Sequence, residues 1–248
     1  MKTITSRTNQ EISRVVHLKE AREREKQQRF TAEGVRVCKT LIDNGIQLDT
    51  LYTTEPLLEQ AQKITFDDNI VLVSQSVMEK ISSHKTPSGV LGVFAIPKTP
   101  KPEALTSGLV LANITDPGNM GTLIRTAVAV GVRSVVIVEG VDPFHPKVIQ
   151  ASAGTIGSIQ IFRWSWEHLL THKKNKALYA LTVSNGKPIS TIDSHNALLV
   201  IGNEAHGIPE NWLVDCENKI TIPMPGGTES LNAAVAGSIA LYLTFAKT

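Results

Sequence analysis

Five polar side chains stand in short glycine-containing segments where a plain turn would not require them. They are distributed over TDPGNMGTLIRTA, GNEAHGIPE and PMPGGTESLN, and they are Asn119, Arg125, Glu204, Ser230 and Asn232. A single Ser or Asn before a helix is most often an N-cap, and that interpretation suits Ser230 taken alone. Arg125 is not a simple general base, because a guanidinium group stays protonated; its fork of donors suits a phosphate or another oxygen-rich group. Together, the five side chains favour a binding or catalytic site.

The glycines of the second and third segments allow the backbone to approach a ligand closely or to adopt a positive φ; they are Gly202, Gly207, Gly226 and Gly227. Glycines also end strands in ordinary folds, so these four identify no ligand alone. The segment SAGTIGS contains no G-x-G-x-x-G pattern, and nothing in the chain matches a phosphate-binding P-loop. An NAD-type or P-loop enzyme is therefore disfavoured.

The elements that must position these segments alternate between strand and helix after Pro100. Apolar runs predict strands at residues 108–114, 134–140, 177–183 and 197–203, with helices at residues 145–154 and from about Ser230 to the C-terminus. Strands that are almost continuously apolar and alternate with helices predict an α/β fold with a parallel sheet covered on both faces. In such open sheets, ligands bind beyond the carboxyl ends of the strands, where the three polar segments lie.

The part before Pro100 has a different character and predicts a smaller α/β unit. Residues 9–29 lack Gly and Pro and predict one amphipathic helix with basic residues on its outer face, followed by a helix at residues 31–45 and three short strands. The segment PKTPKPEALTSG predicts a linker. We therefore expect an N-terminal domain at residues 1–98, a linker at 99–107 and a second domain at 108–248.

Charge is concentrated near the N-terminus. Residues 1–40 contain ten Lys or Arg against five Asp or Glu, although the net charge of the chain is only +2. Such a segment suits phosphate contacts, and a solvated helix with internal ion pairs explains the charge equally well.

Composition excludes several classes of protein. With 248 residues, 42% of them hydrophobic, the chain can bury a core. Its two cysteines do not form the pattern of a disulfide-rich protein. The first residues do not resemble a secretory leader, and the longest apolar run is shorter than the roughly 20 residues of a membrane span. His168 and His172 have a metal-binding spacing but no third ligand nearby. We expect a soluble cytoplasmic protein without a metal site.

The order and wording of the three polar segments resemble the SpoU or TrmH family of RNA ribose 2′-O-methyltransferases, within the SPOUT class. The motifs are DPGNMGTLIRTA, VIGNEAHGI and IPMPGGTESLNAAVAGSIALYL. The segments ITSRTNQEI, RFTAEGVRVCKTLI and ISSHKTPSGVLGVF are similar to the family's small substrate-binding domain, so the resemblance covers nearly the whole chain. Family members often carry glycine and a basic residue where this chain has Ala205 and His206.

The resemblance implies a SPOUT-type open parallel sheet whose C-terminal segment forms a trefoil knot, with S-adenosylmethionine bound in a bent shape inside it. It also implies a homodimer. The small residues of the last helix would let two backbones approach closely, but packing of that helix on its own sheet explains them equally well.

The resemblance also implies roles for individual residues. Cofactor contacts would come from Gly202, Ile222, Met224 and Leu231. The catalytic residues would be Arg125, Asn119, Glu204, Ser230 and Asn232. Of these, Arg125 would position the acceptor nucleotide while a phosphate oxygen or a perturbed group takes the proton. Asn119 would hold the ribose or the Arg125 loop, and Glu204 would fix the geometry through a charge-assisted pair. The basic N-terminal domain would bind RNA through Arg14, Lys19, Arg22 and Arg24.

These features favour an enzyme that methylates structured RNA. The accessory domain resembles those of ribosomal RNA methylases more than the shorter extensions of transfer RNA enzymes, so 23S ribosomal RNA is favoured and transfer RNA is the alternative. A non-catalytic RNA-binding member of the fold is a second class of hypothesis, against which the joint presence of Asn119, Arg125 and Glu204 counts.

Overall fold

The computed structural model describes residues 1–246. Contacts within the chain divide it into two compact units, one formed by Met1–Pro97 with Asp142–Gly157 and the other by Lys98–Val141 with the described residues from Ser158 onward. The break at Pro97 adjoins the expected linker. The segment Asp142–Gly157, which the expected division gives to the second domain, is grouped with the first unit because helix α7 (Pro146–Ala151) packs on strand β2 (Arg29–Glu33).

The first unit is built on a mixed five-stranded sheet with the order β1-β4-β3-β5-β2. Its other strands are β1 (Lys2–Ile4), β3 (Leu48–Thr53), β4 (Ile70–Val73) and β5 (Val90–Ala95). Strands β1, β4 and β3 run parallel, whereas β5 pairs antiparallel with both β3 and β2. The three strands expected from the apolar runs are present.

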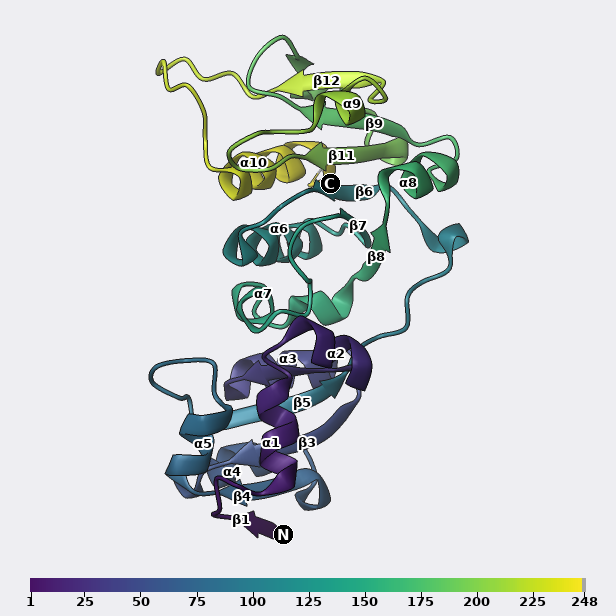
Figure 1. The fold of residues 1–248 in the computed structure, drawn as a ribbon. Coiled ribbons are helices and arrows are strands. Elements are labelled where there is room, and N and C mark those ends of the chain that lie inside the picture. Colours follow the sequence, from purple (N-terminus) through teal and green to yellow (C-terminus); the bar gives the residue numbers. More distant parts are fainter. Residues whose placement is uncertain (247–248) are drawn as a thin grey trace. The chain divides into compact units, whose positions relative to one another are not determined.

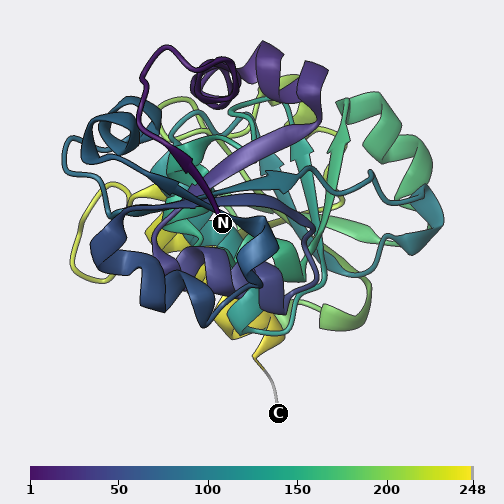
Figure 2. The ribbon, with the colours of Figure 1, turned by 90° about the horizontal axis from the view of Figure 1, so that it is seen from below.

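Helices cover both faces of this sheet: α1 (Gln10–His17), α2 (Ala21–Gln27), α3 (Val35–Asp43), α4 (Leu58–Gln62) and α5 (Gln75–Ile81). Figure 2 shows α1 and α5 on one side and α3 and α4 on the other. Apolar side chains of α1 and α5 form one core with Tyr52, Val71 and Leu91.

Two expectations for this unit were wrong. The single helix expected at residues 9–29 is two helices, because the chain leaves the helical path between His17 and Ala21. The helix expected at residues 31–45 begins only at Val35, since the residues before it form β2 and pair with β5.

The second unit is built on a seven-stranded sheet with the order β10-β12-β9-β11-β6-β7-β8, and all of its pairings are parallel. The strands are β6 (Gly108–Ala112), β7 (Ser134–Val138), β8 (Gln160–Trp164), β9 (Ala177–Leu181), β10 (Lys187–Pro188), β11 (Ala197–Ile201) and β12 (Asn218–Thr221). The expected parallel α/β sheet is confirmed. The apolar runs did not reveal β8, which forms one edge and has a mixed polar and apolar sequence.

Four helices cover this sheet: α6 (Pro117–Ala129), α8 (Trp166–His172), α9 (Glu210–Leu213) and α10 (Ala233–Phe245). Helix α10 packs against α6 and also contacts β11, an arrangement visible in Figure 1. A Cβ atom on Gly237 of α10 would lie 2.4 Å from the Leu123 side chain of α6. The small residue at position 237 therefore serves packing within the chain.

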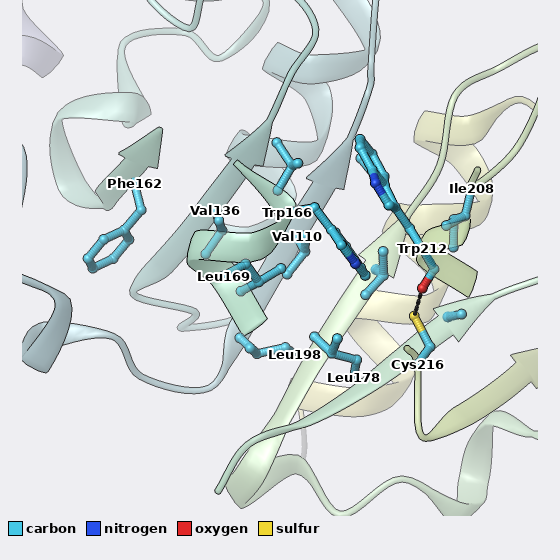
Figure 3. Close-up of a cluster of buried hydrophobic side chains, with 14 of the residues drawn as sticks. Val110, Val136, Phe162, Trp166, Leu169, Leu178, Leu198, Ile208, Trp212 and Cys216 are labelled. Carbon is cyan, nitrogen blue, oxygen red and sulfur yellow. Dashed lines mark hydrogen bonds between the residues drawn. The ribbon is translucent and has the colours of Figure 1, made fainter. Parts of the chain in front are cut away.

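On the other face, α8 and α9 enclose a core with the apolar side chains of the central strands. The rings of Trp166 and Trp212 stack with centroids 5.0 Å apart and an interplanar angle of 9°. Figure 3 shows this pair beside Cys216, whose thiol donates to the Trp212 carbonyl. Burial raises the pKa of the Cys216 thiol to about 12, so this cysteine is a packing residue. Within residues 1–246, no helix is both long and apolar enough to cross a membrane.

Candidate functional site

Three loops at the carboxyl edge of the parallel sheet converge. They follow β6, β11 and β12 and lead into α6, α9 and α10. Strands β6 and β11 are neighbours, and β9 separates β11 from β12. Because all of these strands run in the same direction, their carboxyl ends lie at one edge, and polar residues far apart in the sequence meet there.

Asn119, Glu204 and Asn232 form a chain of hydrogen bonds across this edge. The Asn119 Nδ2 donates to Oε1 of Glu204 at 2.9 Å, and Asn232 Nδ2 donates to Oδ1 of Asn119 at 3.2 Å. The second carboxylate oxygen of Glu204 accepts from the Thr115 hydroxyl at 3.4 Å. One residue from each of the three sequence motifs therefore contributes to a single polar network.

Asn119 lies in the first turn of α6 and Asn232 directly precedes α10, so the local sequence fixes both side chains. Helix α6 begins after Asp116, whose carboxylate accepts from the backbone N–H of Asn119 at 2.7 Å. Helix α10 is capped by Asn232, whose Oδ1 accepts from the N–H groups of Ala234 and Val235. The capping role therefore belongs to Asp116 and Asn232, and Ser230 caps neither helix.

Asn203 also supports the site, although it was not among the site residues predicted from the sequence. Its Nδ2 donates to the Asn113 carbonyl at 2.9 Å, and its Oδ1 accepts from the N–H groups of Ala205 and His206. Two backbone hydrogen bonds between Asn203 and Gly207 close the loop into a tight turn. An asparagine opening a loop that ends in glycine is a turn signal, and it could have predicted this role.

A cavity of about 450 Å³ lies beside the network. Its walls include all four residues expected to contact a cofactor, together with Glu204 and Ser230; the lining is Leu181, Thr182, Val183, Ile201, Gly202, Asn203, Glu204, Ala205, His206, Gly207, Ile208, Leu213, Ile222, Met224, Ser230, Leu231, Ala233 and Ala236. This volume lies in the range of pockets that enclose small ligands.

The cavity walls suit a cofactor that carries a positive charge and is surrounded by apolar groups. Most of the lining is aliphatic side chain or backbone, and Glu204 and His206 are the only ionisable side chains among the described lining residues. A Cβ atom at Gly202 would lie 2.4 Å from backbone atoms of Gly207 and Ile208. Only glycine at position 202 allows the two sides of this loop to approach so closely.

Arg125 stands apart from the Asn119 network within the chain. Its side chain is exposed and makes no hydrogen bond or ion pair with any of the described residues. Because an α-helix has about 3.6 residues per turn, a side chain six positions after Asn119 points to a different side of α6. Ser230 lines the cavity without bonding to the other four residues of the expected catalytic set.

The four basic residues expected to bind RNA divide into two kinds. Arg14, Lys19 and Arg22 are exposed, whereas Arg24 is buried. Lys19 is held, because its Nζ donates to the carbonyls of Lys80 and Ser82 at 3.0 and 2.6 Å. Burial lowers the pKa of Lys19, although the Glu33 carboxylate acts in the opposite direction.

The expectation that Arg24 lies on an exposed basic face is wrong. Its side chain is only 2% exposed, and the Nη2 and Nε atoms lie 2.6 and 2.7 Å from Oδ2 of Asp142. Nη1 donates to the carbonyls of Leu18 and Lys19, both at 2.9 Å. With its donors used internally, Arg24 stabilises the first unit and is not available to RNA.

The His168 and His172 rings stack on each other on α8, with centroids 4.0 Å apart, and both contact the Trp164 ring. In the part of the chain that the structure describes, no three His, Cys, Asp or Glu side chains gather as a potential metal site.

Comparison with family models gives two matches. Residues 107–242 match the SpoU rRNA Methylase family, and residues 9–92 match the MRM3-like substrate binding domain. The first match contains the three loops of the site, and the second contains most of the first unit.

Individual relatives agree with these matches. The chain is 28% identical to the 23S rRNA (guanosine(2553)-2′-O)-methyltransferase RlmP of Bacillus subtilis, over 98% of both chains. It is 26% identical to a 23S rRNA (uridine(2479)-2′-O)-methyltransferase of Streptomyces viridochromogenes, over 86% of this chain and 81% of the relative. The AdoMet-bound rRNA methyltransferase from Sinorhizobium meliloti superimposes with a TM-score of 0.87 at 28% identity, covering 98% of this chain and 97% of the other.

Proposed function

Because the chain belongs to the SpoU rRNA methylase family, we propose that it transfers the methyl group of S-adenosylmethionine to a ribose 2′-hydroxyl of large-subunit ribosomal RNA. The observation that carries this proposal is the convergence of the Asn119, Glu204 and Asn232 side chains beside an apolar cavity. Related enzymes named for 23S rRNA act on a guanosine in one case and a uridine in another. The family therefore does not dictate the base, and recognition by RNA shape and phosphate contacts fits the proposal.

The cavity residues Gly202, Ile222, Met224 and Leu231 would hold S-adenosylmethionine, which supplies an electrophilic methyl group on a sulfonium centre. The aliphatic walls would exclude water, and the Glu204 carboxylate is the lining group of opposite charge. Close alignment of donor and acceptor contributes up to about 7 to 11 kcal/mol in well-ordered reactions. The network around Asn119 would provide that order at the acceptor side.

Arg125 would clamp the acceptor nucleotide with its guanidinium donors, since it is exposed and free of partners among the described residues. Glu204 would hold the Asn119 amide in place through a charge-assisted hydrogen bond, and Ser230 and Asn232 would complete the acceptor side. The 2′-hydroxyl proton would pass to an RNA phosphate oxygen or to a locally perturbed group, because a guanidinium cannot accept it.

We also propose that the protein is a homodimer that joins through α10. Exposed apolar side chains recur along one side of this helix, at Val235, Ile239, Tyr242 and Leu243. The buried side of the same helix packs on α6, so the exposed side is free for a second copy. The Thr126 hydroxyl lies 3.0 Å from that of Ser238, which is one of the contacts between α6 and the packed side of α10.

Three finer features complete the proposal. The segment after β12 would thread through the loop that follows β11 to form a trefoil knot. Residues 1–98 would serve as the RNA-binding domain, 99–107 as the linker and 108–248 as the catalytic domain. A cytoplasmic location fits the free thiols of Cys38 and Cys216.

Calorimetry with S-adenosylmethionine, combined with methyl-transfer assays on deproteinised 23S rRNA and on transfer RNA, tests the proposal. Wild-type protein should bind the cofactor and label ribose 2′-oxygens. Gly202→Ala should weaken cofactor binding at least about tenfold, because the added Cβ displaces the backbone that lines the cavity. Absence of cofactor binding by the wild type would refute the enzyme assignment, and labelling of transfer RNA alone would refute the ribosomal substrate.

A further inference from the structure

The loop at residues 82–89 is held in place by a buried carboxylate. Glu33 ends β2, and its side chain is only 6% exposed. Its two oxygens accept from the Ser82 hydroxyl at 2.9 and 2.8 Å, from the Ser88 N–H at 3.0 Å and from His84 Nδ1 at 2.8 Å. One side chain therefore fixes the loop near both of its ends.

Lysines secure the same loop from outside. Lys19 Nζ donates to the carbonyls of Lys80 and Ser82, at the end of α5. Lys80 Nζ donates to the Arg7 carbonyl at 2.6 Å, so the segment around Arg7 lies beside this end of α5. The Lys19 ammonium thus lies at the base of the loop, and Lys80 holds the segment that carries the exposed Arg7.

The outward part of the loop offers hydrogen-bond donors and positive charge. Ser83, His84, Lys85 and Thr86 are exposed. The backbone N–H groups of Ser83, Lys85 and Thr86 donate to no acceptor within residues 1–246. Among the described residues, Glu33 is the only carboxylate hydrogen-bonded to the loop, and its oxygens already face four donor contacts. Because Nδ1 of His84 lies 2.8 Å from a carboxylate oxygen, which can only accept, this ring nitrogen is the donor in that contact.

We propose that the loop at residues 82–89 is a phosphate-binding element for the backbone of the RNA substrate, with Lys85 contacting a phosphate and Glu33 as a positioning residue. This inference rests on the proposed RNA substrate and names where in the first unit it is held. A preorganised loop of N–H, hydroxyl and ammonium donors matches phosphate oxygens. The cations around it come from separate segments, an arrangement that suits a polyanion better than one small anion.

Binding to deproteinised 23S rRNA, measured as a function of KCl concentration with full-length protein, tests the loop. Loss of one phosphate contact should lower the slope of log K against log[KCl] by about 0.7 to 0.9. At 0.15 M salt this corresponds to binding about fivefold weaker for Lys85→Ala, to an equal extent on unrelated RNA sequences. The control Lys63→Ala removes the same charge from an exposed position on the flank of α4, and should leave the slope unchanged.

Glu33→Gln separates loop geometry from net charge. The substitution removes one negative charge, so charge alone would strengthen RNA binding, whereas a loosened loop should weaken it at least about twofold. Calorimetry with S-adenosylmethionine should give the wild-type affinity for each variant and shows that the second unit is intact. A wild-type salt slope for Lys85→Ala, or tighter binding by Glu33→Gln, would overturn the loop proposal.

The outcomes also distinguish this inference from the proposed function. If the wild type methylates RNA but Lys85→Ala binds as tightly as wild type, only the loop assignment fails. If Lys85→Ala binds RNA less tightly while the wild type binds no S-adenosylmethionine, the loop stands and the enzyme assignment fails.

Discussion

At the scale of single residues, the site separates side chains that are fixed by the chain from one that is not. Asn119, Glu204 and Asn232 are oriented by hydrogen bonds to each other. Arg125 has no such partner among the described residues and projects from another side of α6. Because Arg125 bonds to no described residue, its guanidinium is available to bind a ligand. The Asn119 network would hold the rest of the site in a fixed geometry around that ligand.

Replacement of Arg125 by Ala should lower the rate of methyl transfer by about 100-fold or more, because the acceptor loses its orientation. The affinity for S-adenosylmethionine should stay within about twofold of wild type, since Arg125 does not line the cavity. The matched control is Arg163→Ala, an exposed arginine on the edge strand β8. Single-turnover methyl transfer and calorimetry measure the two effects, and transfer at nearly the wild-type rate would rule out the clamp.

The sequence predicted that the polar loops would converge better than it predicted the hydrogen bonds that hold them in place. Because parallel strands end at one edge, polar residues after β6, β11 and β12 could be assigned to one site before the structure was known. The role of Asn203 depends on the shape of a loop, and the burial of Arg24 depends on Asp142, which is 118 positions away. The turn that Asn203 opens has a local sequence signal, but its partner Asn113 and the Asp142 partner of Arg24 cannot be read from local sequence patterns.

At the scale of elements, Arg24 explains why the expected long helix is broken. The carbonyls of Leu18 and Lys19 at the end of α1 have no partner within that helix, and Arg24 of α2 donates to both. Helix propensity favours continuation through these residues, which include neither Gly nor Pro. The buried pair with Asp142 holds Arg24 of α2 in place after this break, so a tertiary interaction favours two helices over the local preference for one.

Arg24→Met should therefore destabilise the first unit by about 3 to 5 kcal/mol, because it leaves the Asp142 carboxylate without its partner and two carbonyls without donors. Arg22→Met, on the exposed side of the same helix, should change stability by less than about 0.5 kcal/mol. Urea unfolding followed by circular dichroism provides the comparison. Equal midpoints for the two variants would show that the Arg24 pair contributes no stability.

For the molecule as a whole, the exposed apolar face of α10 is a surface that the other described residues leave uncovered. Tyr242 is 64% exposed and Val235 is 49% exposed, and Ile239 and Leu243 on the same side of the helix are exposed as well, although all four are large apolar side chains. Such a face favours association, and its other side is already occupied by α6. A two-fold interface through this helix would put the same residues of both copies in contact.

Val235→Glu combined with Tyr242→Glu should convert a dimer into a folded monomer, since both positions are exposed and the added carboxylates repel each other across a two-fold interface. Val214→Glu, at an exposed apolar position beside α9, should leave the dimer intact. Light scattering after size exclusion gives the mass of each variant. A wild-type protein that is monomeric at micromolar concentration would exclude this interface.

We propose that the molecule methylates ribose 2′-hydroxyls of large-subunit ribosomal RNA. The most direct measurement is a map of ribose methylation in ribosomal and transfer RNA from cells that contain or lack the protein, with Arg125→Ala as the complementing control. We predict that a ribose methylation in 23S rRNA disappears without the protein, returns with the wild type and fails to return with Arg125→Ala. Unchanged 23S rRNA methylation in cells that lack the protein would contradict the claim.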